Sequence, residues 1–471
     1  MFNERFSKIT LVVLILFFVA GNFQLVADDA PQKGFKITKD TVLDLGITLT
    51  PEFESNTTKA SEETVTVTEA EGVTTEKKAE IISDLILHYA PSIRIKLDDS
   101  DKTVGFGVYF DYNHYLGIED SGTSKKLSEL DLKATILGEF NKSGLVIFEF
   151  KDTLSRSSSP DGQELSGKHR NLQNAFETAV SFKNPADTLF GKISLGVDLS
   201  YYEDSKDREA MKDYNYVSPM ANFFGRWKFL PRTMAFTTVS VRYQDYYESS
   251  IRSAARSIPF NVFLGLMGQV SQHISSKVSV GYTGIFGEAP RHDYNANLEM
   301  VFKHEKGTYL AIGYLRNVKP SATYSWSGTH KVYLNFNQKF AKVFLAAVNF
   351  SYSYLNYGKS IEYSGKDEWT AQNDGSFTND IKDDAGTIIT KYEVVMPQGR
   401  RADHLIQLTP SFSYNILAWL GLKLSYIFEY KDTDYYKKTV VDYLSEGSKV
   451  TTTSHYDYID HRVLLSVVLD Y

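Results

Sequence analysis

The chain ends on the stretch HRVLLSVVLDY, residues 461–471, in which polar and apolar side chains alternate. One face of the stretch is apolar and the other polar: Leu469, Val467, Leu465 and Val463 against Asp470, Ser466 and Arg462. A period of two predicts a β-strand with one apolar face. A strand of this kind that ends on an aromatic residue, here Tyr471, is typical of the closing strand of an outer-membrane β-barrel, whose outward side faces lipid.

The same alternation recurs along the chain, for example over 104–112, 294–302 and 344–354. We count about eighteen such segments. The connections after odd-numbered segments are long and polar, and those after even-numbered segments are short turns. This parity predicts an all-β fold: an antiparallel transmembrane outer-membrane β-barrel of about 18 strands, with both termini in the periplasm, short periplasmic turns and long external loops. A barrel of this size can enclose an aqueous lumen.

The N-terminus predicts export. Arg5 and Lys8 precede an apolar run over 9–20, and Ala27 offers a small-residue cleavage site, so 1–27 is interpreted as a signal peptide. Without it, 49 basic and 57 acidic residues leave a net charge of −8. A mildly acidic exported chain is a poor candidate for binding nucleic acid, and the absence of cysteine excludes a disulfide framework.

The predicted domains are a signal peptide (1–27), a short periplasmic segment (28–40) and a single barrel (41–471) with long extracellular loops at 55–80, 358–401 and 432–454. The segment 55–80 is rich in Thr, Glu and Ser and low in apolar residues, so we expect a mobile loop there. The acidic loop around Asp374, Asp380, Asp383 and Asp384 could hold Ca²⁺ through oxygen ligands, but the spacing of these carboxylates matches no EF-hand, so we expect disorder there.

The polar faces carry charges that would be costly to bury in a core. We therefore predict that they line a water-filled lumen. These charges either form a solvated wall of paired groups or include a subset that selects the cargo. The candidate lumen-lining residues are Arg94, Lys96, Tyr109, Asp111, Lys133, Glu139, Glu149, Asp198, Arg226, Arg242, Glu299, Tyr333, Lys423, Glu429 and Arg462.

Inward aromatic rings could also stack on sugars, and Tyr109, Tyr202, Tyr333 and Phe224 are candidates for such a track. The sequence holds no Gly-x-Ser-x-Gly elbow, no Gly-rich phosphate loop and no zinc-binding His pair on a helix. We therefore expect no catalytic residue, no metal and no cofactor, and a protein that is not an enzyme. His455 and His461 lie near acidic residues, but a lone surface histidine is usually only solvated.

Several short motifs resemble the β-barrel porin type 2 family. They are WKFLPRT (227–233), the hairpin 260–282 with Gly265 and Gly268, RADH (401–404) leading to Trp419-Leu420 and Tyr426, and the C-terminal DY (457–458) with HRVLL (461–465). The resemblance implies an outer-membrane barrel for exopolysaccharide export that works with a periplasmic polysaccharide-export protein, and it implies no catalytic residue. The long inserts at 55–80 and 358–401 depart from the family pattern.

These observations favour a non-enzymatic outer-membrane channel that translocates a secreted polysaccharide across the outer membrane of a Gram-negative-type bacterium. The expected partners are outer-membrane lipids, the polysaccharide cargo, a periplasmic export protein and the barrel-assembly machinery, which would recognise the strand ending at Tyr471. One alternative is a general diffusion or uptake porin, for which 358–401 would supply an inward-folded constriction loop. Another is a surface adhesin that the barrel anchors.

Overall fold

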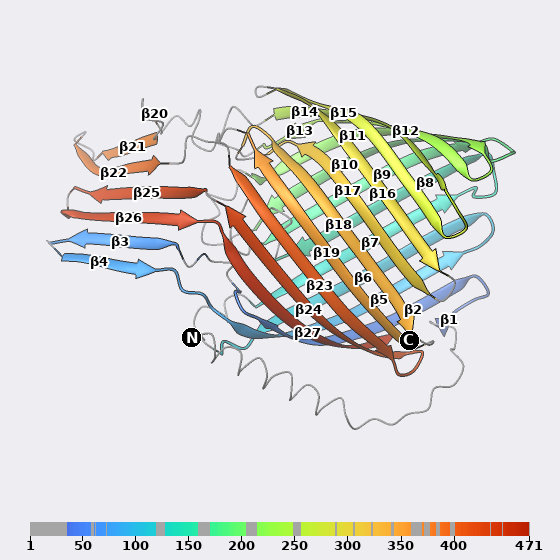
Figure 1. Ribbon diagram of the computed structural model, residues 1–471, viewed down its shortest axis with the longest axis horizontal. Helices are drawn as coiled ribbons and strands as arrows, with labels where there is room; N and C mark the ends of the chain where they lie inside the picture. Colours follow the sequence, from blue (N-terminus) through green and yellow to red (C-terminus); the bar gives the residue numbers. More distant parts are fainter. Residues whose placement is uncertain are drawn as a thin grey trace.

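A computed structural model shows an antiparallel barrel with a second sheet at one end (Figure 1). The predicted signal peptide and part of the segment 28–40 lie outside the described residues. The structure describes residues 35–470 except 58–60, 62, 72, 119–127, 159–169, 204–213, 248–255, 288–289, 305–306, 322–323, 341–342, 359–369, 372–376, 383–386, 396–400, 434 and 445.

Eighteen long strands form the barrel, which confirms the predicted fold class and strand number. The first nine are β2 (Thr41–Glu54), β5 (Asp84–Asp98), β6 (Lys102–Tyr115), β7 (Glu129–Phe140), β8 (Val146–Ser157), β9 (Asn171–Lys183), β10 (Leu189–Tyr202), β11 (Tyr216–Leu230) and β12 (Thr233–Arg242). The other nine are β14 (Arg256–Gln269), β15 (Ile274–Gly287), β16 (Arg291–His304), β17 (Thr308–Lys319), β18 (Ser327–Phe340), β19 (Phe344–Tyr357), β23 (Ala402–Asn415), β24 (Leu420–Thr433) and β27 (Tyr458–Asp470).

Each barrel strand pairs with the next one along the barrel, and β27 closes the sheet against β2. The closing register joins Ile47 to Leu469 and Glu54 to Arg462. Two short strands complete the sheet: β1 (Phe35–Lys36) pairs with β2, and β13 (Gln244–Asp245) continues β12 beside β14. Among the described residues no helix is long and apolar enough to cross a membrane.

The outer surface is apolar because one residue in two along each strand is a large hydrophobic side chain that no other part of the protein covers. Leu195, Leu264 and Val280 are 58–62% exposed. Aliphatic side chains left this exposed in water would be unfavourable, but they suit lipid, which covers the outward face of a transmembrane barrel.

The long connections do not all behave as loops. Seven strands form a second antiparallel sheet, which projects from the end of the barrel where the long connections lie (Figure 1). In spatial order they are β20 (Thr370–Ala371), β21 (Phe377–Lys382), β22 (Ile388–Val395), β25 (Tyr436–Tyr443), β26 (Ser448–His455), β3 (Val65–Ala70) and β4 (Val73–Lys78). We call it the outer sheet, and we call the two ends of the barrel the long-loop end and the short-turn end.

The outer sheet corrects two expectations. The segment 55–80, expected to be a mobile loop, contains β3 and β4, and Asp380, expected in a disordered acidic loop, lies in β21. Asp374, Asp383 and Asp384 lie outside the described residues. These segments were missed because each hairpin is too polar and too short to be stable alone. Each one is stabilised by backbone pairing with another long connection, as in β3 with β26 and β22 with β25.

Glycine inside the barrel allows aromatic rings to lie flat on the wall. The ring of Phe236 lies across Gly265, and a Cβ at Gly265 would also come within 2.7 Å of the carbonyl oxygen of Val278. Tyr333 covers Gly313 in the same way. Rings that lie along the wall fill the gap left by glycine and stay out of the lumen.

We predict that Gly265→Ala destabilises the barrel by about 1–3 kcal/mol, because the added methyl group overpacks the wall between Phe236 and the Val278 carbonyl. The measurement is the temperature at which the folded band is lost in heat-modifiability electrophoresis. Gly191→Ala is the matched control, since a Cβ at Gly191 meets no atom within 4 Å. Equal unfolding temperatures for the two variants would contradict this packing argument.

Candidate functional site

Three contacts identify the inner face of the barrel, because each skips one strand. Lys192 on β10 binds Glu149 on β8 with an Nζ–Oε2 distance of 2.6 Å. Arg242 on β12 binds Asp198 on β10 at 2.7 Å, and the Tyr333 hydroxyl on β18 donates to Glu299 on β16 at 2.7 Å. Side chains two strands apart converge on the concave side of a closed sheet and diverge on the convex side, so the polar face is inside.

The ladder registers place all fifteen candidate lumen residues on this face. Tyr109 lies opposite Lys133, Asp111 opposite Asp131, and Glu139 opposite Glu149. Arg94 and Lys96 lie opposite Gly107 and Gly105. The same alternation places Arg226 on the same face as Arg242, and it places Lys423 and Glu429 on the same face as Arg462. The structure does not bring the fifteen into one site: they are spread around the whole circumference.

Exposure of the inner face differs between the two ends of the barrel. Toward the short-turn end the side chains of Arg94 and Lys96 are 68% and 48% exposed. Toward the long-loop end Glu52, Glu429 and Asp460 are at most 6% exposed. The lumen is therefore open to water near the short turns and crowded near the long loops.

A network of charges crowds the long-loop half where the sheet closes. His88 Nε2 lies 2.9 Å from Glu52 Oε2, and its Nδ1 lies 3.4 Å from Asp111 Oδ1. On the other side of the seam Arg462 lies 3.2 Å from Asp460 and 3.9 Å from Glu429.

Sequence analysis missed Glu52, His88 and Asp460 as members of this network. Their positions on polar faces of alternating segments were a usable signal. What joins them is the pairing of β2 with β27, which links opposite ends of the chain.

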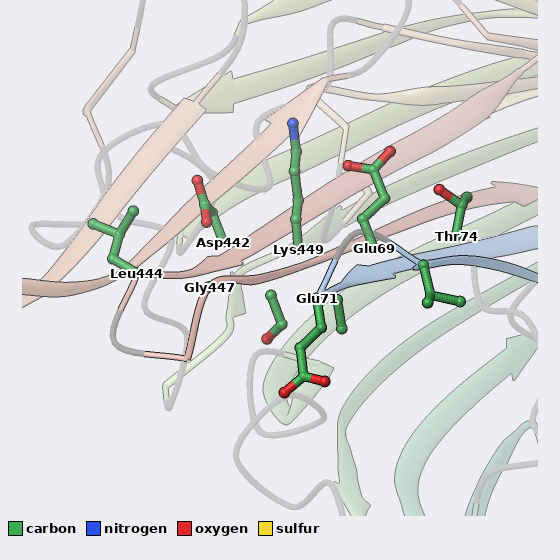
Figure 2. A pocket seen from close by; sticks show the side chains of 10 residues that line it. Glu69, Glu71, Thr74, Asp442, Leu444, Gly447 and Lys449 are labelled. Atoms are coloured by element: carbon green, nitrogen blue, oxygen red, sulfur yellow. The ribbon is translucent and has the colours of Figure 1, made fainter.

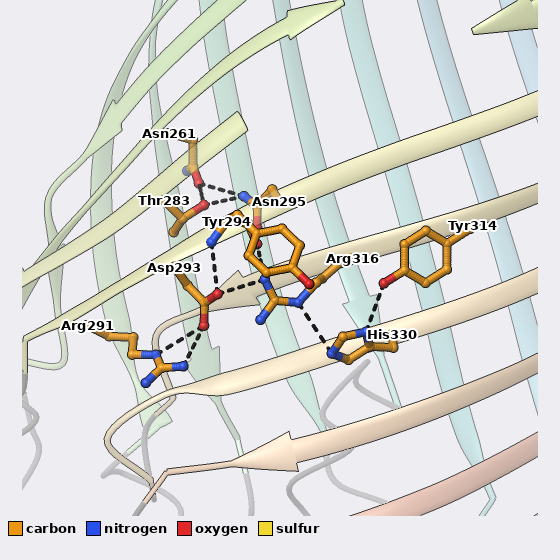
Figure 3. Close-up of polar contacts among 9 residues, drawn as sticks. All are labelled: Asn261, Thr283, Arg291, Asp293, Tyr294, Asn295, Tyr314, Arg316 and His330. Atoms are coloured by element: carbon orange, nitrogen blue, oxygen red, sulfur yellow. Dashed lines mark hydrogen bonds and ion pairs between the residues drawn. The ribbon is translucent and has the colours of Figure 1, made fainter. Parts of the chain in front are cut away.

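Hydroxyl and amide groups fill much of the remaining inner wall. Asn261 accepts a 2.6 Å hydrogen bond from the Thr283 hydroxyl and a 3.2 Å bond from the Asn295 amide, and Asn295 also bonds Thr283 (Figure 3). Buried serines lie at the same kind of position on many strands: Ser181, Ser194, Ser200, Ser218, Ser279, Ser351, Ser353 and Ser425. Such groups can exchange one hydrogen-bond partner for another at little net cost.

The four aromatic residues proposed as a sugar track each have their own partners. Phe224 packs against Phe190 and Phe236, with ring centroids 6.1 and 6.3 Å apart. Tyr202 is buried against Tyr214, and Tyr333 lies over Gly313. Tyr109 is 42% exposed. The structure therefore shows one exposed inward ring, Tyr109, and three engaged in packing or hydrogen bonds, and the sugar track stays a prediction.

Arg401 forms a buried centre at the root of the outer sheet. It is 3% exposed, and its Nη2 lies 2.7 Å from Oδ2 of Asp403, which is fully buried. Four tyrosine rings surround its guanidinium, with centroids 4.9–5.9 Å away: Tyr324, Tyr357, Tyr435 and Tyr456. Burial alone would lower the pKa of Arg401, but the bonds from Asp403 outweigh it and raise that pKa.

The four rings come from three separate parts of the chain, which explains what Arg401 does. Tyr324 lies between β17 and β18, and Tyr357 ends β19. Tyr435 and Tyr456 lie at the two ends of the β25–β26 hairpin. A single buried cation therefore ties the root of the outer sheet to the barrel wall through its ion pair and its contacts with the tyrosine faces.

A row of alternating charges crosses the outer sheet. Glu69, Lys449, Asp442, Lys391 and Asp380 are successive cross-strand partners on β3, β26, β25, β22 and β21. Opposite charges at directly opposed positions favour this register over a shifted one. The row therefore specifies how the three long connections align.

A cavity of about 400 Å³ lies at the tips of the β3–β4 and β25–β26 hairpins (Figure 2). Glu69, Glu71 and Asp442 give it a negative lining, together with one cation, Lys449. Figure 2 shows Lys449 between Asp442 and Glu69. The cavity is open to solvent, and its lining combines these charges with the apolar side chains of Ala70, Val73 and Leu444.

One group of described residues has metal-ligand geometry. The ligand atoms of Glu63, His455 and Asp457 lie within 4.8 Å of one another near the root of the outer sheet. Asp457 also accepts a 2.8 Å hydrogen bond from Ser61. These residues could hold a divalent cation, although Glu63 is largely exposed and exposed groups of this kind commonly carry none.

Comparisons with known proteins show little beyond the fold. No family model matches the chain, so the resemblance to the β-barrel porin type 2 family stays a prediction. No curated protein matches either. Solved structures with a similar fold include the outer-membrane protein OpdK from Pseudomonas aeruginosa, at 7% identity and a TM-score of 0.43, which covers 91% of this chain and 99% of that one.

Two further solved structures have a similar fold. OccAB4 from Acinetobacter baumannii has 10% identity and a TM-score of 0.40 over 91% of this chain and 98% of its own. A mutant of the ferric enterobactin receptor from Pseudomonas aeruginosa has 7% identity and a TM-score of 0.42 over 91% and 80%. Likenesses this distant do not identify a substrate.

We predict that Arg401→Ala loosens the root of the outer sheet, since it leaves the Asp403 carboxylate buried beside Lys431 alone. The expected cost is about 3–5 kcal/mol, as for other broken buried ion pairs. Limited proteolysis of the folded barrel should then cut within 370–395 many times faster than in the native protein. Arg256→Ala is the control, because that arginine is 73% exposed and 3.5 Å from Asp245. Equal cleavage of both variants would refute this role for Arg401.

Proposed function

We propose that the protein is a non-enzymatic channel of a bacterial outer membrane and that its cargo is a secreted polysaccharide. The outward apolar face supports the membrane location, and the polar inner face supports passage of a hydrophilic molecule. In this proposal the long-loop end and the outer sheet lie outside the cell, and the termini and the short turns lie in the periplasm.

The observation that carries the proposal is the position of the long connections. Their described residues pair with one another in the outer sheet, away from the lumen (Figure 1). A diffusion porin that selects small solutes would need an inward constriction loop, and 358–401 was the candidate. The described strands of that segment, β20–β22, instead extend the outer sheet. This arrangement suits a long polymer better than a sieve for small solutes.

The chemistry of the wall supports the same cargo. The inner charges are of both signs and largely paired, as in Lys192–Glu149 and Arg242–Asp198. Paired charges create little net field along the axis, so they neither trap nor repel a neutral or weakly charged glycan. Hydroxyl and amide groups between them offer many weak, exchangeable hydrogen bonds. The crowded long-loop half would then be the place where passage is controlled.

Export also requires partners at the short-turn end. We propose that a periplasmic polysaccharide-export protein delivers the polymer there, beside the exposed Arg94 and Lys96. The strand β27, which ends next to Tyr471, is proposed to be recognised by the barrel-assembly machinery.

A second candidate function is surface adhesion, and the outer sheet is the observation that favours it. Its edge strand β4 is exposed at all six positions. An exposed edge can accept a strand from another protein. In this alternative the barrel serves as an anchor and need not conduct.

We predict that the purified barrel conducts ions in planar bilayers and that long polysaccharides block it more strongly than monosaccharides. Replacing 359–396 with a linker of about four residues should leave the conductance within about twofold of the native value, because β20–β22 lie outside the lumen. An increase of several-fold would support the constriction-loop alternative. A barrel that does not conduct, with or without 359–396, would favour the adhesin.

A further inference from the structure

Histidines recur near the long-loop end of every second strand in one part of the barrel. Four strands that start at the long-loop end carry one within their first four residues: His292 on β16, His330 on β18, His404 on β23 and His461 on β27. Among the strands that run in this direction, these four follow one another around the barrel. His114 lies at the same end of β6, one residue before the strand ends.

Each of the four histidines is paired with a tyrosine on the preceding strand of the barrel. The tyrosine oxygen lies 2.5–2.9 Å from Nδ1 of the imidazole in Tyr282–His292, Tyr314–His330, Tyr352–His404 and Tyr426–His461. The two rings of each pair lie side by side, with centroids 6.0–6.2 Å apart. A geometry that repeats on four successive strand pairs is a built feature of the barrel.

These pairs lie on the outward face. Tyr282 is opposite Val262, Tyr314 opposite Leu298, and His461 opposite Phe428 in the ladder. All are on the face opposite to Asp293, Glu299 and Arg462, which share the inner face. The Tyr–His pairs therefore border the apolar surface on its long-loop side, which faces the outer leaflet in the proposed membrane orientation.

A buried guanidinium, Arg316, lies beside one of these pairs, and its charge is matched by the Asp293 carboxylate (Figure 3). Arg316 stacks on Tyr294 with its guanidinium carbon 3.6 Å from the ring centroid. Its Nε lies 3.3 Å from Nε2 of His330, and its Nη1 lies 2.7 Å from Asp293. Arginine can only donate, so Nε2 of His330 accepts and its Nδ1–H donates to Tyr314.

The other three pairs have different surroundings. A tyrosine hydroxyl that donates to Nδ1 leaves the ring proton on Nε2, where it can be donated to a lipid headgroup. At His404 the cross-strand partner is Asp432, whose carboxylate would oppose an anionic ligand. We therefore expect His292 and His461 to contribute most, because Nε2 of His330 already accepts from Arg316 and His404 lies opposite Asp432.

We propose that the Tyr–His pairs form a binding surface for the phosphate groups of lipid A in the outer leaflet. This inference rests on the proposed outer-membrane location. Lipid A fits because its phosphates lie at the depth of the pairs and its acyl chains would cover the adjacent apolar face. An imidazole N–H can donate a hydrogen bond to an anionic phosphate oxygen. The tyrosine hydroxyl of each pair holds the imidazole ring in a fixed orientation.

The test is native mass spectrometry of the detergent-solubilised barrel mixed with bis-phosphorylated lipid A. In the combined variant His292→Phe, His330→Phe, His404→Phe and His461→Phe, which keeps aromatic bulk, bound lipid A should fall about tenfold. The matched control is His273→Phe with His304→Phe, a ring-stacked pair at the short-turn end with centroids 5.7 Å apart. That control should retain native binding.

Dephosphorylated lipid A separates phosphate recognition from acyl-chain contact. The native barrel should bind it as weakly as the fourfold variant binds the phosphorylated lipid. The proposal would be wrong if the native barrel bound both lipids equally, or if the folded fourfold variant bound phosphorylated lipid A as well as the native barrel does. The pairs would then only form an aromatic border of the apolar surface. Conductance reports separately on the channel, because none of the substituted residues faces the lumen.

Discussion

The fold depends on one constraint: inside a membrane, every backbone N–H and C=O must find a partner within the protein. A sheet meets it only by closing, and here β27 pairs with β2 across more than 400 positions of sequence, from Glu54–Arg462 to Gly46–Asp470. Once the sheet is closed, the period of two puts one face on lipid and one on the lumen. The apolar outer surface and the charged inner wall both follow from that single closure.

Closure also concentrates charge at the seam. The first and last strands bring Glu52 and Asp460 to the same side of the lumen, where His88 and Arg462 lie beside them. Acidic groups this poorly exposed require such partners, because an isolated buried charge is expensive. These groups lie on β2, β5 and β27, so only closure of the sheet brings them together.

The barrel was predictable from sequence because its signals are local. Alternation in stretches such as 294–302 and the parity of connection lengths are properties of neighbouring residues, and they identified the strands and the polar face. The outer sheet was not predicted in this way, because in a stretch such as 65–70 only two valines alternate with threonines before Glu69, and such strands are too short and too polar to be stable alone. Their partners, and the tyrosines around Arg401, are brought together only by the closed barrel. The charge network at the seam was hidden for the same reason.

The outer sheet and the barrel satisfy their backbone hydrogen bonds in different solvents. In lipid the backbone must close on itself, whereas in water the outer sheet can leave its edges β4 and β20 open. What it needs instead is alignment, which the row from Glu69 to Asp380 supplies, and attachment, which Arg401 supplies. Because both devices hold the long connections to one another outside the wall, the described parts of these connections leave the lumen to its own paired charges and hydroxyls. The barrel wall and the outer sheet therefore depend on separate sets of contacts, and Arg401 with its tyrosines joins the two.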